Sequence, residues 1–360
     1  MMMRAAPSPR RSRIATRAAL ALLVALFSAP LSAGEPVFPG ITWDMPGETP
    51  PDGWDAERLR AAEARFQATK PTAVMVVHDG RVVAAWGDVA RTVNVASVRK
   101  SVLSALYGIA VAEGRIDLTR TLAELAIQDN EPRLTAAERQ ATIRDLLMSR
   151  SGIYHGAAYE TFDMARARPP RGSHAPGEFW YYNNWDFNAL GTIYTPLTGE
   201  DIFEAVQRRI ARPTGWEDYE GWRDGRLIYE SVSQHPAYAM LLSTRDLARL
   251  GLLYLNDGLW AGKRIVPAAW VKESTKRWSE AWSGRGYGYM WWEFPAGRGL
   301  AGGGFAALGN RGQAVAVIPS KRLVVAQTAD RHDSPAELGP SHFFQLLWRP
   351  LRPSKGDPQS

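Results

Sequence analysis

Short apolar runs bounded by turn residues lie near both ends of the chain and predict β-strands. Ala73–His78 and Val82–Trp86 flank the dipeptide Asp79-Gly80, which is typical of a tight hairpin. Three more apolar runs toward the C-terminus also predict strands: Tyr287–Phe294, Gln313–Ile318 and Leu323–Thr328. The pattern therefore predicts an early hairpin and a late group of strands.

The middle of the chain has apolar residues at helical spacing instead. In Ser97–Gly114 they repeat every three or four residues, and Gly114 suits the end of a helix. Thr135 followed by Glu138 is a capping-box pattern, which predicts the start of another helix. Further helices are expected at residues 55–67, 120–126, 135–148, 184–197, 200–211, 244–256, 267–275 and 335–348.

Strands that are segregated from helices favour one fold class. They predict an antiparallel β-sheet flanked by helices, an α/β fold of the α+β type, rather than alternating βαβ units. We expect one α/β lobe built from about residues 50–96 and 286–350, and an inserted, mainly helical lobe from about 97–285. A cleft between the two lobes is where a binding site is expected.

The first 33 residues have the pattern of an export signal. Five arginines and no acidic residue precede the apolar run Ala18–Phe27, and Leu31-Ser32-Ala33 offers small residues for cleavage. The run is short for a bilayer, so we expect removal and an exported, periplasmic or secreted domain over 34–360, with no stable membrane insertion. An uncleaved membrane tether stays an alternative, and Arg10-Arg11 weakly resembles a twin-arginine signal.

Composition narrows the chemistry further. The formal charge of +6 falls to about +1 once the five leader arginines are removed, so no nucleic-acid partner is expected. The chain has no cysteine, which excludes disulfides, thiolate metal sites and a cysteine nucleophile. The six histidines show no metal-binding spacing such as H-E-x-x-H, so neither a metal nor another cofactor is expected.

The first candidate for chemistry is Ser97-Val98-Arg99-Lys100, at the predicted start of a helix. The spacing places Ser97 and Lys100 one turn apart on the same face. A partly desolvated amine can take the proton of a serine hydroxyl, or its charge can keep a neighbouring phenol ionised. The same four letters also suit a surface helix, so the motif needs support from elsewhere in the chain.

The second candidate is Tyr182-Asn183-Asn184, in a turn before a predicted helix. The Tyr182 phenolate, assisted by Lys100, would remove the Ser97 proton and return it to a leaving group, and Asn184 would accept a hydrogen bond from Lys100. Tyr181 and Asn183 satisfy the same spacing. Alternatively, the aromatic residues belong to the core and the asparagines cap the helix.

Together with Leu146–Ile153 and Pro176-Gly177, these motifs resemble the class C β-lactamase family in order and separation over roughly residues 70–330. Tyr181–Asn188 and the stretch from Gly309 to Gln313 look most like the branch of 6-aminohexanoate-dimer hydrolases and related esterases. In the family pattern the tyrosine stands nine residues before a helix glycine. Gly191 therefore selects Tyr182 and Asn184.

The third motif of that family, K-T-G or H-x-G before a late strand, is absent in its usual form. By position, Ala307-Leu308-Gly309 stands in its place. The resemblance implies backbone oxyanion donors at Ser97 and Asn310, and substrate contacts at Ala307 and Gly309. Tyr154 is a further candidate for the cleft, with a packing role as its alternative.

These observations predict a serine hydrolase that cleaves a small-molecule ester or amide through an acyl-Ser97 intermediate. The missing third-motif cation makes efficient β-lactam hydrolysis doubtful, although Arg311 is a candidate replacement. The alternatives are a D-stereospecific peptidase or weak β-lactamase with the same residues, and a non-hydrolytic penicillin-binding sensor or scaffold. The substrate and the oligomeric state stay open.

Overall fold

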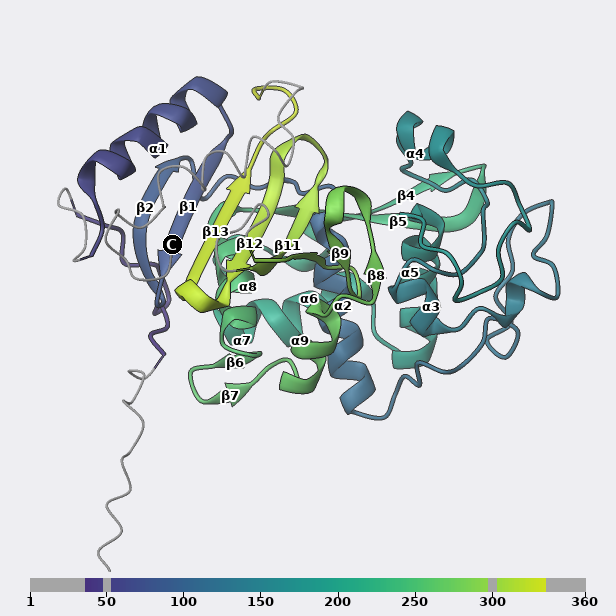
Figure 1. Cartoon of the computed structure of the whole chain (residues 1–360). Helices are drawn as coiled ribbons and strands as arrows, with labels where there is room; N and C mark the ends of the chain where they lie inside the picture. Colours follow the sequence, from purple (N-terminus) through teal and green to yellow (C-terminus); the bar gives the residue numbers. More distant parts are fainter. Residues whose placement is uncertain (1–35, 48–52, 297–302, 335–360) are drawn as a thin grey trace, which may run out of the picture. The chain divides into compact units, whose positions relative to one another are not determined.

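The computed structural model describes residues 36–47, 53–296 and 303–334 (Figure 1). The helices are α1 (Ala56–Thr69), α2 (Val98–Ala112), α3 (Ile143–Leu147), α4 (Phe162–Ala167), α5 (Asn184–Thr198), α6 (Ile202–Val206), α7 (Arg212–Thr214), α8 (Thr244–Leu255) and α9 (Ala268–Thr275). The strands are β1 (Ala73–His78), β2 (Arg81–Gly87), β3 (Val93–Asn94), β4 (Gly225–Glu230), β5 (Ser233–Leu242), β6 (Leu259–Trp260), β7 (Lys263–Arg264), β8 (Ser279–Glu280), β9 (Gly286–Tyr287), β10 (Trp292–Phe294), β11 (Gly304–Gly309), β12 (Gln313–Ile318) and β13 (Leu323–Thr328).

The main sheet joins the two ends of the described chain. Its order is β2-β1-β13-β12-β11-β10-β9-β8, with antiparallel neighbours throughout. β1 pairs with β13 over its full length, from Ala73 opposite Thr328 to His78 opposite Leu323. The predicted hairpin at Asp79-Gly80 and the predicted strands Gln313–Ile318 and Leu323–Thr328 are confirmed, and so is an antiparallel sheet combined with helices.

Helices cover both faces of this sheet. On one face, Phe66 of α1 packs against Trp86 of β2. On the other, Gly251 of α8 lies so close to Val324 and Val315 that an added Cβ would approach their side chains within 3 Å. Gln327 of β13 pairs with Val74 of β1, which pairs with Trp86, so these three side chains point to the same face of the sheet. Val324 is three residues before Gln327 on the same strand, and side chains alternate along a strand, so Val324 points to the opposite face. In Figure 1, α1 and α8 accordingly lie on different sides of the sheet.

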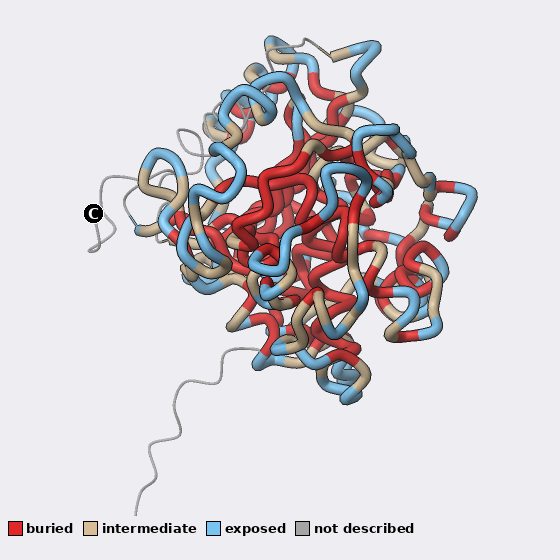
Figure 2. The backbone as a smooth tube through the Cα atoms, turned by 90° about the vertical axis from the view of Figure 1, so that its right-hand side faces the viewer, coloured by how far each residue is buried: buried red, intermediate tan, exposed pale blue. Residues whose placement is uncertain are grey.

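Helix α2 runs through the interior of the described fold. All its residues from Val98 to Ala110 are buried. Gly108 allows the ring of Trp270 on α9 to lie directly against the helix, because a Cβ there would come within 2.3 Å of that ring. In Figure 2 the buried positions gather in the interior and the exposed positions lie around them. The start of α2, which carries Ser97, is therefore held by packing along almost the whole helix.

Two of the expected helices are wrong or shortened. Residues 120–126 form hydrogen-bonded turns and not a helix, and Ala126 adopts a left-handed conformation there. The expected helix at 135–148 is interrupted. Its capping box at Thr135 and Glu138 is present, but a second capping box at Thr142 starts the separate helix α3. The expected helix at 335–348 lies outside the described residues.

The sequence patterns also missed strands in the middle of the chain. β4 and β5 form a hairpin there, and β5 pairs with β3 just before Ser97. Pro236 lies within β5, and proline argues against a strand in sequence-based reasoning. The expected strand Tyr287–Phe294 is divided into β9 and β10, because Met290 adopts a left-handed conformation between them. β11 was not expected.

Candidate active site

Ser97 lies at the amino end of α2, directly after a strained residue. Ala96 has φ 47°, a left-handed conformation that residues with a side chain rarely adopt. The side chain of Asn94, at the end of β3, accepts a hydrogen bond from the Ala96 N–H at 2.9 Å. The pairing of β3 with β5 and this side-chain contact together turn the chain so that Ser97 begins the helix.

Lys100 connects the predicted catalytic side chains. Its Nζ lies 3.0 Å from Ser97 Oγ, 2.8 Å from Tyr182 Oη and 2.7 Å from Asn184 Oδ1. The same amine lies over the rings of Tyr182 and Phe187 at 4.3 and 4.4 Å from their centroids. The structure thus brings together all four side chains that the two sequence motifs singled out.

Burial sets the protonation of this group. Lys100 is 1% exposed, and desolvation together with the nearby charge of Arg99 holds its pKa well below the usual value for lysine. Burial raises the pKa of Tyr182 to about 12, against the opposing effects of a hydrogen bond with Ser97 and the charge of Arg99. Both directions favour the neutral form of the group, the amine of Lys100 and the phenol of Tyr182, over its charged form.

The competing register places its side chains elsewhere. The Tyr181 hydroxyl donates to the carbonyl of Met164 at 2.7 Å, and Asn183 caps α5 by accepting from the N–H of Trp185. Gly191, about two turns after Asn184 on α5, leaves room for the ring of Tyr238, since a Cβ at Gly191 would come within 2.7 Å of that ring. The geometry therefore groups Tyr182 and Asn184, and not Tyr181 and Asn183, with Lys100.

The segment that follows α3 holds the extended chain on both sides of Tyr182 in place. Ser149 Oγ donates to the carbonyl of Tyr181 at 2.6 Å and accepts from the N–H of Asn183 at 3.0 Å. Ser151 Oγ donates to the buried carboxyl of Asp186 at 2.5 Å. Residues on both sides of Tyr182 are thus bonded to this one segment, which limits how far the phenol can move.

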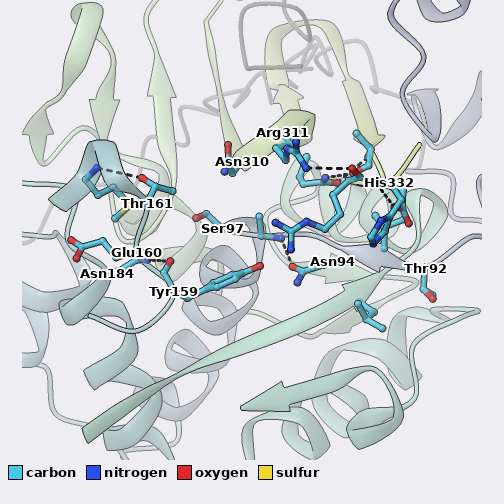
Figure 3. A pocket seen from close by; sticks show the side chains of 18 residues that line it. Thr92, Asn94, Ser97, Tyr159, Glu160, Thr161, Asn184, Asn310, Arg311 and His332 are labelled. Carbon is cyan, nitrogen blue, oxygen red and sulfur yellow. Dashed lines mark hydrogen bonds between the residues drawn. The ribbon is translucent and has the colours of Figure 1, made fainter. Parts of the chain in front are cut away.

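The site opens into a cavity of about 480 Å³ (Figure 3). Ser97 lies near its middle in this view, with Glu160, Thr161 and Asn184 on one side. Asn310, after β11, lies above Ser97 in this view, and Arg311 and His332 lie on the other side. Residues 329–331, after β13, also line the cavity. A substrate in this cavity can present a bond to Ser97 and extend in both directions.

The residues in place of the third motif lie at the end of β11. Ala307 and Gly309 are buried, and neither is among the residues that line the cavity. Gly309 passes so close to the carbonyl of Val95 that a Cβ would lie 2.5 Å from its oxygen, so only glycine allows this strand to approach the start of α2. Asn310 and Arg311 follow and line the cavity, and Arg311 has φ 62°.

A family model described as Beta-lactamase matches residues 59–341. The chain belongs to the beta-lactamase family. This match covers most of the chain, including every residue of the site described above, and it confirms the prediction of a beta-lactamase-family protein.

The relatives of this chain are distant from it in sequence. A 6-aminohexanoate-dimer hydrolase from Paenarthrobacter ureafaciens is 26% identical over 243 residues, 60% of either chain. Solved structures with the same fold include two examples. One is a candidate 6-aminohexanoate-dimer hydrolase from Bacillus anthracis (19% identity, 86% of each chain, TM-score 0.62). The other is a beta-lactamase from Mycobacterium bovis (20% identity, 79% of this chain and 98% of that one, TM-score 0.55). The fold class is confirmed, and the relatives support a hydrolase.

Two tyrosines near the site differ in position. Tyr154 is buried, and its hydroxyl shares a hydrogen bond with His174 Nδ1 at 2.9 Å; it is not among the cavity-lining residues, so a substrate contact there stays a prediction. Tyr159 lines the cavity, and its carbonyl accepts a hydrogen bond from Asn184 Nδ2 at 2.6 Å. The position of Tyr159 shortly after the Ser151-Gly152 turn is the one feature of the sequence that indicates a cavity-lining role for this residue.

Neither a metal cluster nor a bilayer-spanning helix is found in the part of the chain that the structure describes. The acidic and histidine side chains there do not gather in threes with a geometry suited to an ion. Its helices also lack the combination of length and apolar character that crossing a membrane requires.

Proposed function

We propose that this beta-lactamase-family protein is a serine hydrolase that cleaves a small-molecule ester or amide through a covalent acyl-Ser97 intermediate. The observation that carries the proposal is the contact of one buried amine, Lys100 Nζ, with Ser97 Oγ, Tyr182 Oη and Asn184 Oδ1 beside a cavity. A hydroxyl becomes a useful nucleophile when a base with a suitable pKa lies within hydrogen-bond distance.

In the acylation half, Ser97 Oγ bonds to the substrate carbonyl carbon while its proton passes to the neutral amine of Lys100. A neutral amine fits the lowered pKa of Lys100 better than a phenolate fits the raised pKa of Tyr182. The oxyanion that forms is held by the backbone N–H groups of Ser97 and Asn310. The bond from the carbonyl carbon to the leaving oxygen or nitrogen then breaks, and the leaving group takes up the proton from Lys100, relayed through the Tyr182 hydroxyl.

In the deacylation half, the same groups act on water. Tyr182 and Lys100 accept a proton as the water oxygen bonds to the acyl carbon, and the proton returns to Ser97 Oγ as the ester bond breaks. The acid product leaves and the side chains regain their starting protonation. Asn184 keeps the amine aimed at Ser97 throughout by accepting one of its hydrogens.

Several finer features of the proposal follow the sequence. The absence of a third-motif lysine favours esters and linear amides over β-lactams, and the hydrolase named for 6-aminohexanoate dimers is consistent with a linear amide. The class C-like subtype, the two lobes within residues 34–360 and export after removal of residues 1–33 belong to the same proposal. The N-terminal segment lies outside the described residues.

Replacement of Ser97 by alanine tests the proposal. Ser97→Ala should lower turnover of a chromogenic short-chain ester by at least about 10⁴-fold, because the covalent route is lost. Ser104→Ala is the matched control, since Ser104 is buried on the same helix and its hydroxyl has no hydrogen-bond partner among the described residues. Equal activity of purified Ser97→Ala and wild-type protein would exclude the mechanism.

The rival functions use the same residues and differ in the fate of the acyl group. A D-stereospecific peptidase or weak β-lactamase would turn over D-peptides or a cephalosporin faster than esters. A penicillin-binding sensor would keep a fluorescent penicillin bound to Ser97 for hours. A panel of esters, linear amides, D-peptides and a cephalosporin, each run against Ser97→Ala, separates these outcomes.

A further inference from the structure

Arg99 is a buried cation at the centre of the S-x-x-K motif. It is 1% exposed and lies between Ser97 and Lys100 on the first turn of α2. Within the described residues it forms no ion pair, and its Nε and Nη2 have no hydrogen-bond partner. A surface arginine would be exposed to water, and an ordinary core position would hold an apolar side chain. The buried, largely unpaired guanidinium of Arg99 fits neither case.

The location is energetically unfavourable for a cation. Removing a guanidinium from water without a carboxylate partner is costly, and the amino end of a helix repels positive charge. Two aromatic faces offset part of this cost. The guanidinium carbon lies 5.2 Å from the centroid of Tyr159 and 5.1 Å from that of Tyr238. Desolvated contacts between a cation and an aromatic face stabilise the cation.

The remaining contact of Arg99 reaches the residue before the nucleophile. Arg99 Nη1 donates to the carbonyl of Ala96 at 2.9 Å, while Asn94 binds the N–H of the same residue. The left-handed backbone of Ala96 is thereby held at both of its polar groups. A strained backbone conformation persists when its surroundings fix it in this way.

The ring contact of Arg99 leads to the amine by a second path. Tyr159 also has a left-handed backbone, with φ 63°, and its carbonyl binds Asn184 Nδ2. Asn184 Oδ1 in turn accepts from Lys100 Nζ. Arg99 is therefore in contact with one neighbour of Ser97 and with the segment that orients the partner of Lys100.

We propose that Arg99 is a positioning residue for the nucleophile and its base. Its guanidinium binds the Ala96 carbonyl and the Tyr159 ring, and so sets the distance between Ser97 Oγ and Lys100 Nζ. This inference rests on the proposed hydrolase function, and it assigns to the variable position of the motif a role in that reaction.

The charge of Arg99 supports the same role. It contributes to the lowered pKa of Lys100 and acts to lower the pKa of Tyr182 as well. The other titratable groups around the amine are neutral phenols on packed elements: Tyr182, Tyr238 of β5 and Tyr287 of β9, each with a raised pKa. The buried carboxyl of Asp186 on α5 is bonded to Ser151 and Asn183. Removing Arg99 should therefore raise the pKa of Lys100.

The test compares the pH profiles of kcat/KM for Arg99→Gln and the wild type with one chromogenic ester. We expect a fall of about 10- to 100-fold at neutral pH, the range that small misplacements of reacting groups produce. We also expect the acid limb to move to higher pH, because an amine with a raised pKa stays protonated longer. A folded Arg99→Gln protein with wild-type kcat/KM and a wild-type acid limb would overturn the inference.

Arg249→Gln is the matched control. Arg249 is buried on α8, stacks on Trp43 and Trp260 and donates to the carbonyl of Thr214, but lies outside the site. Its loss should lower the melting temperature and leave the acid limb in place. An equal shift of the acid limb in both variants would show a general effect of stability and would also overturn the inference.

Arg99→Lys carries the test if Arg99→Gln does not fold. A lysine keeps a cation but lacks the planar fork that reaches a carbonyl and two rings together. We expect reduced kcat/KM with an acid limb closer to that of the wild type, and wild-type kcat/KM in Arg99→Lys would exclude the positioning role. Failure of the hydrolase proposal itself looks different, since the wild type would then show no Ser97-dependent turnover.

Discussion

The two walls of the cavity are built on opposite principles. On the Ser97 side, the wall contains Asn184, which lines the cavity, and is backed by Lys100 and Tyr182; these three residues are at most 9% exposed and are joined by hydrogen bonds. On the facing side, Asn310 is exposed and Arg311 is half-buried on a turn. The first wall is backed by a group that is shielded from water and held in place, and the second wall is partly exposed and carries basic side chains.

The difference assigns different work to the two walls. A desolvated, fully bonded group is suited to chemistry, because low dielectric shifts pKa values and strengthens electrostatic contacts. An exposed wall with basic residues is suited to selecting substrates, because its charges interact with whatever part of the substrate extends past the reacting bond. Changes on the first wall should therefore affect all substrates alike, and changes on the second should discriminate among them.

The largest effect on this comparison is expected from Lys100→Met. The variant keeps a chain of similar volume and removes the amine that contacts Ser97, Tyr182 and Asn184. We expect kcat/KM to fall by about 10³- to 10⁴-fold for every ester and amide tested, in line with the loss of a general base. Steady-state kinetics with a neutral and a carboxylate-bearing ester measure this.

A selective result would break the comparison. If Lys100→Met lost activity toward one substrate and kept it toward another, the buried wall would be contributing to recognition as well as to chemistry. Circular dichroism and melting temperature serve as controls for folding. Removal of a buried amine should not by itself destabilise the protein strongly.

The second prediction concerns pH. With a lowered pKa at Lys100 and a pKa of about 12 at Tyr182, activity should fall as the pH drops and the amine is protonated. It should show no alkaline loss from Tyr182 until the pH approaches 12. In Tyr182→Phe we expect kcat/KM to drop by about 10²- to 10³-fold, with the acid limb retained.

The acid limb decides between the two candidate bases. Its persistence in Tyr182→Phe would assign it to Lys100. Its disappearance would assign it to the phenol, and would return the mechanism to the phenolate that the motif alone predicts. The pH profile of kcat/KM for the two proteins, measured with one ester, supplies the comparison.

The residues of the buried wall could be predicted from the sequence because the motifs that define them are local or have a fixed spacing. Ser97 and Lys100 are one helical turn apart, so their contact follows once the helix is predicted. Tyr182 and Asn184 lie more than 80 residues away, and only the family spacing to Gly191 selected them over Tyr181 and Asn183. No physical rule of the isolated segment distinguishes the two registers.

On the exposed wall, Asn310 and Arg311 were predicted from their position after the third-motif place, but the rest of that wall could not be predicted in the same way. Residues 329–332 come to the cavity because β13 pairs between β1 and β12, and residues 92–94 come to it because β3 pairs with β5. The second pairing gave no signal, since β5 contains Pro236 and the β4–β5 turn has neither glycine nor asparagine. Such contacts between distant segments depend on sheet topology, which the apolar pattern predicted only as a class.

The smallest expected effect tests the exposed wall itself. Arg311 lines the cavity with Arg331 and His332, and among the described residues its side chain bonds only to the carbonyl of Arg331. Arg311→Gln should lower kcat/KM for a carboxylate-bearing ester by about five- to tenfold, which corresponds to about 1 kcal/mol for a partly exposed charge pair. A neutral ester of equal size should change less than about twofold, and added salt should narrow the difference. Lys263→Gln on β7 removes the same charge outside the cavity lining and should change neither rate. Equal losses for both esters would mean that Arg311 shapes the turn after β11, and the division of work between the two walls would then fail.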